Sequence, residues 1–575
     1  MKRRAALAAF VLLVLAYPLM VRGSYPLSVG IITGALAAGT VGFVLLLGYA
    51  HQLALGQAGF CMVGGYASAI LCVQHKWDPL AALIAGVAAA MALAWMIAAP
   101  ILKLRGFVLA MASLALHLIL VVVAFETAFT GGALGTYGVP KFALFGLPLA
   151  SDLAYYYVVW AIVLAFVLIG LAIDGSRIGR ALKAIAASET AALSAGIDIR
   201  RYKLLMFVLS AGMASVCGSL AVHYLRAMDP NVFGFAFSLN FITAVIVGGL
   251  ETVWGGVVGA VLVTGVREML RGLSLPLWEG VIMGALTVVV LIAFRRGFAG
   301  FLGALYERWT SRDAPPRVSI AEPDNAALAS HGKPAALELA GVSRSFGNLR
   351  AVNNASFHVA AGSITALIGP NGAGKTTLFN LICGYQPLDS GSVSYENRRI
   401  DTLLPDDIAE LGIGRTFQNL QLFDNMSVLE NVMCGRHRFV EREAASRSRA
   451  RAALAFVGLR DAERLPPSAL AFGHQRLVEM ARALALEPRL LLLDEPASGL
   501  NDAETERLAE LVLRIAALGV TVLLVEHDMR LVMGLADHVI VMHHGEKLAD
   551  GAPDDVRREQ AVIDAYLGIE EHAAA

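Results

Sequence analysis

Apolar stretches long enough to cross a membrane recur along the first half of the chain, up to about residue 294. About 20 apolar residues span the hydrocarbon core of a bilayer as a helix. The first stretch follows a basic start but lacks a small-residue cleavage site, so a retained helix is favoured over a signal peptide. The pattern predicts spans near residues 5–22, 27–48, 56–74, 79–101, 105–127, 152–173, 203–224 and 274–294.

From about residue 336 the pattern changes to short apolar, β-rich runs that alternate with helical stretches. The runs are SITALIG, RLLLLDE, VTVLLVEHD and HVIVMHHG. This alternation is typical of a mostly parallel sheet covered by helices. Between the two patterns, residues 309–335 are polar and rich in Pro, Ala and Ser, which indicates a linker. We therefore expect an all-α polytopic membrane domain over 1–308, with about 8–10 transmembrane helices, and an α/β domain over 336–570.

Composition supports this division. The 575 residues are 57% hydrophobic and 16% charged, which is unusual for a wholly soluble protein. The formal net charge of zero conceals an asymmetry. Residues 1–312 hold 21 Lys and Arg against 11 Asp and Glu, whereas residues 313–575 hold 25 against 35. A basic apolar half joined to an acidic half indicates a membrane domain plus a soluble one, and the basic excess reflects cytoplasmic loops rather than nucleic-acid binding.

The run GPNGAGKT, residues 369–376, lies between a predicted strand and a predicted helix. It matches G-x-x-x-x-G-K-[ST], a loop whose backbone N–H groups and following helix N-terminus hold phosphates. Lys375 is predicted to reach the β- and γ-phosphates, and the Thr376 hydroxyl to bind Mg²⁺. The residues predicted to bind ATP here are Gly369, Asn371, Gly372, Ala373, Gly374, Lys375, Thr376 and Thr377.

A second apolar run, LLLLDEP, ends in Asp494 and Glu495. A buried strand of this kind delivers carboxylates to its carboxyl end, where α/β sheets bind ligands. We expect Asp494 to hold the Mg²⁺ shell and Glu495 to polarise the attacking water.

Basic residues predict the orientation of the membrane domain. Clusters at 2–4, 103–105 and 177–203 fall on one side if every predicted span crosses once, so that side is cytoplasmic. The chain after Arg296 must also be cytoplasmic, because an ATP-using domain follows. This requires the apolar stretch 236–268, interrupted by two Gly-Gly pairs, to enter and return as a hairpin of short or broken helices.

With these motifs in place, residues 336–570 resemble an ATP-binding-cassette (ABC) ATPase. LAFGHQRLVEMARAL, residues 470–484, is similar to the family's signature segment, usually LSGGQ and a helix. The resemblance implies that Gly473 and His474 bind the γ-phosphate of ATP held by the other ATPase domain of a dimer. The resemblance also implies a Mg²⁺-sensing Q-loop glutamine that contacts the membrane domain, a switch histidine on the γ-phosphate, and an aromatic residue stacked on adenine; these are Gln418, His527 and Phe346.

Three positions depart from the family pattern. Ala471 replaces the signature Ser, and His474 replaces its Gln. Asn501 ends the D-loop, where Asp is usual, so the loop keeps hydrogen-bonding capacity but loses a charge. The phosphate-loop lysine, both carboxylates and the switch histidine are all present, so we still predict active ATP hydrolysis coupled to transport.

The membrane half resembles the permease of branched-chain amino-acid importers, and the ATPase half is similar to the partner ATPase of that system, including EPASGLN and VIDAYLG. The permease-like segments are 47–69, 102–116, 130–140, 176–211 and 245–262. Two proteins that are usually separate would then be fused here. Residues 189–196 resemble the coupling loop that docks on the ATPase domain, with a plain solvated loop as the alternative.

Several polar residues lie in or near the apolar spans, where burial is costly and often functional. Each could contact substrate, or could instead join helices or lie at an interface. They are Gln52, Gln57, His117, Glu126, His223 and Asn240.

The leading hypothesis is a multi-pass importer subunit of the bacterial inner membrane with a cytoplasmic ATPase domain. The resemblance implies a second permease, a second ATPase domain, a periplasmic binding protein, ATP and Mg²⁺. Urea, short amides or aromatic acids are alternative cargoes. An exporter half-transporter is a rival, against which the extra spans and single short coupling loop argue; the other rival is a membrane-anchored ATPase that does not transport.

Overall fold

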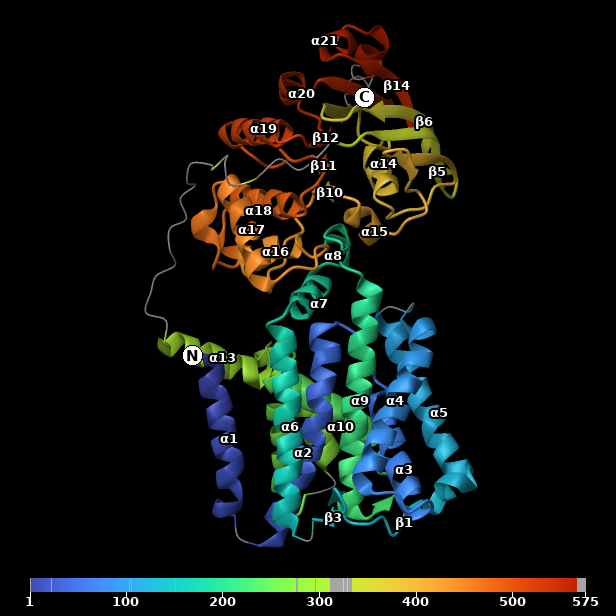
Figure 1. Ribbon diagram of the computed structural model, residues 1–575, viewed down its shortest axis with the longest axis vertical. Coiled ribbons are helices and arrows are strands. Elements are labelled where there is room, and N and C mark those ends of the chain that lie inside the picture. The colour runs from blue at the N-terminus through green and yellow to red at the C-terminus, as the bar shows by residue number, and fades with distance from the viewer. Residues whose placement is uncertain are drawn as a thin grey trace. The chain divides into compact units, whose positions relative to one another are not determined.

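The computed structural model describes residues 2–565, apart from Arg22, Lys103, Arg105, Ala150, Pro276, Leu277, Arg295 and residues 311–323, 325–327 and 329–333. The chain folds as two compact units, which Figure 1 draws from blue to red along the sequence. The first unit comprises Met1–Leu182 and Arg200–Ala314, and the second comprises Lys183–Ile199 and Pro315–Ala575. Most of the predicted linker therefore lies outside the described residues.

The first unit is helical. Its helices are α1 (Lys2–Met20), α2 (Ser24–Val44), α3 (Gln57–Val73), α4 (Pro79–Ile101), α5 (Gly106–Glu126), α6 (Asp152–Asp174), the start of α7 (Arg177–Ala187), α9 (Ile199–Leu225), α10 (Phe235–Gly248), α11 (Trp254–Gly272), α12 (Glu279–Ala293) and α13 (Gly297–Thr310). A π-helical turn, η1 (Leu45–Tyr49), extends α2. The connections hold η2 (Ala128–Thr130), η3 (Gly132–Leu134), β1 (Thr136–Tyr137), β2 (Ala143–Leu144), β3 (Leu147–Pro148) and β4 (Ala227–Met228).

The predicted spans coincide with these helices. Within the described residues, five helices are long and apolar enough to cross a membrane, or six if the bent pair Glu279–Ala293 and Gly297–Gly303 is one span. Three further helices, Arg4–Met20, Gln57–Val73 and Phe235–Gly248, are apolar but shorter. The predicted all-α membrane domain is confirmed, and the shorter helices explain why hydropathy alone gives a higher count of spans.

The stretch 236–268 forms a helical hairpin, as its glycine pairs predicted. A Cβ on Gly248 would lie 1.9 Å from the carbonyl oxygen of Gly255, and a Cβ on Gly259 would lie 1.7 Å from that of Ala244. These pairs step in opposite directions along the chain, so α10 and α11 run antiparallel. Only residues without a side chain allow two helix backbones to approach this closely.

The core of the first unit is centred on α2, whose second half is almost entirely buried. This helix packs against α6 and α11. The hydroxyl of Thr40 donates to the carbonyl oxygen of Gly256 at 2.8 Å, which ties α2 to the start of α11. Trp160 of α6 donates its indole N–H to the carbonyl oxygen of Gly30 at 3.1 Å. Such hydrogen bonds satisfy polar groups that could find no water in a bilayer.

The second unit is built on a six-stranded sheet in the order β10-β11-β12-β7-β13-β14. All adjacent pairs are parallel except β13 and β14. The strands are β10 (Ile413–Arg415), β11 (Leu490–Asp494), β12 (Thr521–Val525), β7 (Ile364–Ile368), β13 (His538–His543) and β14 (Glu546–Gly551). The central strands are buried along their whole length, because helices cover both faces of a parallel sheet.

A smaller antiparallel sheet has the order β6-β5-β8-β9 and consists of β6 (Leu349–Val359), β5 (Leu337–Phe346), β8 (Ser390–Tyr395) and β9 (Arg398–Arg399). The helices are α8 (Glu189–Ser194), α14 (Lys375–Ile382), α15 (Pro405–Glu410), α16 (Val428–Cys434), α17 (Glu443–Phe456), α18 (Phe472–Ala485), α19 (Asp502–Ala517), α20 (Met529–Leu535) and α21 (Pro553–Val556), with short turns η5 (Arg460–Ala462) and η6 (Pro467–Ala469). The predicted α/β class of this half is confirmed. The carboxyl ends of the parallel strands share one edge, where ligands bind in such sheets.

Candidate nucleotide-binding and hydrolysis site

The phosphate loop, residues 369–376, connects β7 to α14 at this edge. Gly374 has a φ of 96°, and a Cβ there would lie 2.3 Å from the carbonyl oxygen of Ala351. A Cβ on Gly369 would lie 2.2 Å from the carbonyl oxygen of Met542. Only glycine fits these two positions. The loop therefore keeps the tight form that presents the N-terminus of α14, with its positive dipole end, to a phosphate.

Lys375 is the first residue of α14 and is buried. Its ammonium group donates to the carbonyl oxygens of Gly369 at 2.6 Å and Pro370 at 3.0 Å, so the side chain lies over the loop. Burial lowers the pKa of Lys375, while the carboxylates of Glu495 and Asp494 oppose this shift. The structure thus brings the predicted lysine within electrostatic reach of both predicted carboxylates.

The other residues predicted to bind ATP lie in the same loop and in the first turn of α14. Asn371 and Gly372 are exposed at the tip of the loop, and Ala373 is buried beneath it. Thr376 is exposed in the first turn of α14, where its hydroxyl is accessible to a ligand, and Thr377 is half-buried.

Asp494 is the last residue of β11 and is 2% exposed. One carboxylate oxygen, Oδ2, accepts from the guanidinium of Arg415 at 3.1 Å. Arg415 ends the neighbouring parallel strand and also donates to Asn380 at 2.8 Å. Burial raises the pKa of Asp494, and Arg415 opposes the shift. The other oxygen, Oδ1, is buried without a hydrogen-bond partner in the described part of the chain, which is the chemistry a hard cation would satisfy.

Glu495 follows directly and has a left-handed backbone, with a φ of 45°. Its side-chain Oε2 accepts from the amide of Gln418 at 2.9 Å, and Nδ1 of His527 lies 3.9 Å from the same oxygen. Strained backbone of this kind costs about 1–3 kcal/mol and is concentrated at functional sites. Three residues predicted from separate motifs are therefore side by side at the sheet edge.

The signature residues start α18, with Ala471 as the N-cap and no side-chain hydrogen bond capping the helix. Within the described residues, no hydrogen bond or ion pair joins Gly473 or His474 to the phosphate loop of the same chain.

Phe346 ends β5 and is 41% exposed, with the guanidinium of Arg344 stacked 5.1 Å from its ring centre. The adjoining strand, β6, places the Ala351 carbonyl against Gly374 of the phosphate loop. The Phe346 ring is therefore partly exposed on this hairpin, with the Arg344 guanidinium beside it.

Sequence reasoning missed a charged cluster on α18. Arg476 donates to the carbonyl oxygens of Phe417 at 2.5 Å and Gln418 at 2.6 Å, and Arg482 donates to a third carbonyl of the same segment at 2.6 Å. Glu479, fully buried between them, accepts from Arg476 at 3.1 Å. The signature helix thereby holds the Q-loop backbone. The sequence feature that could have predicted this cluster is the regular spacing of its three charged residues along one face of an otherwise apolar helix.

The predicted coupling segment belongs to the second unit, where α8 packs against α15. The hydroxyl of Tyr385 donates to the carbonyl oxygen of Thr190 at 2.9 Å, and the amide of Asn425 donates to that of Lys183 at 2.9 Å. Two alanines of α8 are fully buried. The prediction that this segment docks on the ATPase domain is confirmed, and the plain solvated loop is excluded.

Tyr385 also connects this helix to the hydrolysis site, because its ring lies 5.5 Å from the Arg415 guanidinium that holds Asp494. Tyr385→Phe keeps the ring and removes the hydrogen bond to α8. One hydrogen bond is worth about 0.5–1.5 kcal/mol, so we expect cargo transported per ATP hydrolysed to fall by roughly 2- to 10-fold. The measurement is uptake and phosphate release in the same proteoliposomes.

Tyr395→Phe is the matched control for this prediction. The Tyr395 hydroxyl is buried without a hydrogen-bond partner among the described residues, so its loss should leave the transport-to-hydrolysis ratio unchanged. An equal ratio in both variants would show that the Tyr385 hydroxyl does not contribute to coupling.

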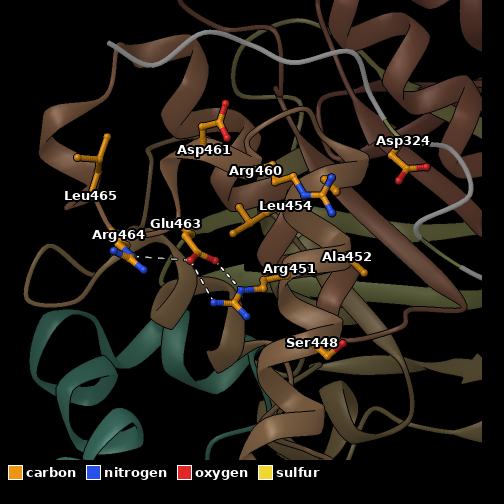
Figure 2. A pocket seen from close by; sticks show the side chains of 11 residues that line it. Asp324, Ser448, Arg451, Ala452, Leu454, Arg460, Asp461, Glu463, Arg464 and Leu465 are labelled. Atoms are coloured by element: carbon orange, nitrogen blue, oxygen red, sulfur yellow. Dashed lines mark hydrogen bonds and ion pairs between the residues drawn. The ribbon is translucent and has the colours of Figure 1, made fainter. Parts of the chain in front are cut away.

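A hollow of about 760 Å³ lies elsewhere on this unit, beside α17 (Figure 2). Arg451 and Glu463 in its wall form hydrogen bonds of 2.6 and 3.1 Å, and Arg451 holds the pKa of Glu463 below its usual range. None of the residues predicted to bind nucleotide lines it. Because this carboxylate is already paired, the sheet edge remains the better candidate for the nucleotide site.

Three family models match the chain. Residues 29–291 match "Branched-chain amino acid transport system / permease component", residues 352–498 match "ABC transporter", and residues 546–572 match "Branched-chain amino acid ATP-binding cassette transporter".

Curated relatives match the ATPase half. The high-affinity branched-chain amino acid transport ATP-binding protein LivG of Salmonella typhimurium is 40% identical over 248 residues, which are 40% of this chain and 97% of that protein. BraF of Pseudomonas aeruginosa, with the same description, has the same identity and coverage. The crystal structure of the ADP conformation of an ATP-binding cassette of an ABC transporter is 32% identical and covers 41% of this chain and 99% of its own, with a TM-score of 0.38.

A multi-pass helical unit joined to a phosphate-loop ATPase unit of this fold defines an ABC transporter subunit, one whose ATPase half binds ATP. The chain belongs to the branched-chain amino acid ABC transporter family, and it fuses the permease and ATP-binding components that the family models describe.

Proposed function

We propose that this chain imports branched-chain amino acids across the bacterial inner membrane, driven by ATP hydrolysis, as the fused permease and ATPase subunit of an ABC importer. The observation that carries the proposal is that both halves of one chain match components of branched-chain amino acid transport. The role of LivG and BraF in high-affinity branched-chain amino acid transport supports the cargo assignment.

In the proposed hydrolysis reaction, the phosphate-loop backbone and Lys375 bind the β- and γ-phosphates. Glu495 orients and polarises the attacking water, Gln418 positions that carboxylate, and His527 contacts the γ-phosphate. The 2.9 Å hydrogen bond between Gln418 and Glu495 and the nearby His527 ring support these roles. Phe346 stacks on the adenine.

Thr376, Asp494 and Gln418 would hold Mg²⁺. The unpartnered, buried Oδ1 of Asp494 supports this assignment, since oxygen ligands are those that Mg²⁺ prefers. When bound, the ion would neutralise the charge that develops between the β- and γ-phosphates. Within the described residues, no cluster of three or more His, Cys, Asp or Glu side chains offers an all-protein metal site, which fits an ion shared with the nucleotide.

The full transporter would contain a second permease, a second ATPase domain and a periplasmic binding protein. Gly473 and His474 of one ATPase domain would complete the nucleotide site of the other. Closure of the two domains on ATP would then move α8, whose contact with Tyr385 supports a role in coupling.

The test is affinity purification of the full chain in a gentle detergent, with subunits identified by mass spectrometry, followed by uptake of leucine against urea, an aliphatic amide and an aromatic acid. We expect a second permease, a second ATPase and a periplasmic protein, and uptake of leucine. A homodimer without a binding protein would favour an exporter. Uptake of another cargo in place of leucine would replace the amino-acid assignment within the same family.

A further inference from the structure

The D-loop and the signature segment lie against each other in the ATPase unit. A Cβ on Gly499 of the D-loop would lie 3.0 Å from the ring of Phe472. The φ of Gly499 is 80°, a conformation that glycine adopts without strain. The D-loop backbone therefore passes directly against the signature. The two segments form one surface, the signature surface, which comprises residues 471–474, residues 498–501 and Glu504.

Glu504 places a carboxylate on this surface. Its carboxyl carbon lies 2.9 Å from the position that a Cβ on Gly473 would occupy, and Oε1 lies closer still. Oε1 is therefore in contact with the backbone of Gly473. A side chain at position 473 would have to displace this carboxylate.

The cap of α19 uses the other oxygen of the Glu504 carboxylate. Oε2 accepts from the backbone N–H of Asn501 at 3.1 Å, and Oδ1 of Asn501 accepts from the N–H of Glu504 at 3.0 Å. Together they form a capping box at the start of the helix. Glutamine can fill this position of a capping box as glutamate does. The cap therefore explains why the side chain turns back towards the D-loop, but it does not require a negative charge.

No cation neutralises this carboxylate in the described part of the chain. No Lys, Arg or His side chain among those residues lies within ion-pair distance of Glu504. By contrast, the buried Glu479 of α18 accepts from Arg476 at 3.1 Å. The guanidinium of Arg476 is further occupied by two carbonyl oxygens of the Q-loop. The Glu504 carboxylate therefore acts unopposed on any ion that binds at Gly473.

A phosphate bound at Gly473 would be repelled by this charge. The proposed function places the γ-phosphate of ATP from the partner ATPase domain at Gly473 and His474. Because Glu504 contacts the same glycine, that phosphate would lie inside the screening length of about 8 Å at physiological ionic strength. Two negative charges at such a separation raise the free energy of the bound state.

We propose that Glu504 lowers the affinity of the signature surface for the γ-phosphate of ATP held on the phosphate loop of the partner ATPase domain. The carboxylate weakens the closed state, in which ATP lies between the two domains, and so favours its opening. It leaves the phosphate loop, Glu495 and His527 unchanged. The charge therefore sets the ATP concentration that closure needs, whereas the hydrolysis rate at saturating ATP does not depend on it. This inference rests on the proposed function, because it needs two ATPase domains that share ATP.

The test is ATP hydrolysis by Glu504→Gln in the purified full chain, assembled with its partner subunits. Glutamine keeps the capping box and the size of the side chain and removes the charge. We expect the KM for ATP to fall about threefold, within the range of single exposed charge interactions. The rate at saturating ATP should stay within about twofold of wild type. The two KM values should converge between about 0.1 M and about 1 M salt, as the screening length falls from about 10 Å to about 3 Å.

Glu430→Gln is the matched control, since Glu430 fills the same position in the capping box of α16. No hydrogen bond or ion pair joins Glu430 to the signature surface among the described residues, so this variant should keep the wild-type KM. Glu504→Asp retains the charge and should keep a KM closer to wild type than Glu504→Gln does. All variants are compared at equal amounts of monodisperse, assembled complex.

Three results would overturn the role of the Glu504 charge. They are an unchanged or higher KM in Glu504→Gln, a fall in KM that persists at about 1 M salt, and an equal fall in Glu430→Gln. A wild-type transporter that hydrolyses no ATP would instead overturn the proposed function itself.

Discussion

Replacing Glu495 with glutamine is expected to lower the rate of ATP hydrolysis by about 10²- to 10⁴-fold, the usual contribution of a general base. ATP binding should persist, because the amide has the same size and the phosphate loop is untouched. The Glu495 side chain is 16% exposed and lies between Gln418 and His527, where water can reach it. The measurement is phosphate release by the purified transporter, with retained ATP counted by filter binding.

A neighbouring acid, Glu526, offers the obvious alternative base, and its surroundings argue against it. It is fully buried, and its two oxygens accept from the backbone N–H groups of Ala497 at 2.8 Å and His527 at 3.2 Å. Burial raises its pKa. Glu526 therefore holds two loops together.

Glu546→Gln, an exposed acid on β14, is the matched control for the Glu495 variant and should leave the hydrolysis rate within about twofold, as expected of surface positions. Undiminished hydrolysis in Glu495→Gln would remove the assignment of Glu495 as the base.

The phosphate loop could be predicted from sequence because all its parts are contiguous: strand, glycines, lysine and helix start. The proximity of Glu495 and His527 could not be predicted from contiguous residues, because it depends on how two strands pair. It follows from β11 and β12 being parallel neighbours whose carboxyl ends share an edge. The family resemblance predicted the roles of Glu495 and His527, whereas the strand order explains why the two side chains lie close together.

The partners of Asp494 could not be predicted in this way. Nothing in the local pattern GRTFQN indicates that Arg415 is buried, because a charge after a short strand is equally compatible with an exposed end. Its burial comes from the pairing of β10 with β11, which sets the two charged side chains at adjacent strand ends. The docking of Tyr385 on α8 likewise joins segments 195 residues apart.

The unusual D-loop residue has a local explanation. Asn501 caps α19, where its Oδ1 accepts from the N–H of Glu504 at 3.0 Å and the Glu504 carboxylate accepts from the N–H of Asn501 at 3.1 Å. Asn and Asp are about equally good N-caps. The loss of charge noted from the sequence is therefore compatible with the helix start, and its effect on communication across a dimer remains a prediction.

Hydropathy located the helices of the first unit because each apolar run has the length of a span. It could not predict where these helices cross one another. Helix α5 passes the start of α3 so closely that a Cβ on Gly56 would lie 2.2 Å from the carbonyl oxygen of Ser113, and the length of an apolar run does not predict such an approach. Periodicity identifies buried faces, but it does not reveal which buried polar groups lack partners.

Arg415 forms one of the most buried ion pairs in the ATPase unit, so its replacement is expected to destabilise that unit strongly. The Arg415 and Asp494 side chains are 4% and 3% exposed, and the guanidinium stacks near the rings of Tyr385 and Phe417. Removing one member of such a pair leaves an uncompensated charge, which costs about 3–5 kcal/mol. Arg415→Leu should therefore lower the melting temperature of this unit by roughly 6–20 °C, taking about 2–4 °C per kcal/mol for a domain of this size.

The stability lost in Arg415→Leu should depend on pH, and the direction of that dependence identifies the unpaired charge of Asp494 as the cause. Without Arg415, the pKa of the buried Asp494 rises further above its unfolded value, so the folded state binds a proton more tightly than the unfolded state. An acid with a raised folded pKa destabilises the fold increasingly as pH rises from its unfolded pKa towards its folded one. Arg415→Leu should accordingly be more destabilised at pH 8 than at pH 5.5, in thermal unfolding of the full chain in detergent.

Asp494→Asn in the Arg415→Leu background removes the buried charge, so the double variant should regain much of the lost stability and lose the pH dependence. Arg344→Leu, which breaks an exposed pair with Asp389, is the matched control and should leave the melting temperature nearly unchanged. The transition that ATP shifts upward identifies the ATPase unit, because a ligand stabilises the fold that binds it. If the single variant lost equal stability at both pH values and Asp494→Asn recovered none of it, lost packing of the guanidinium would be the cause, and the ion pair would contribute little to holding the Mg²⁺ carboxylate in place.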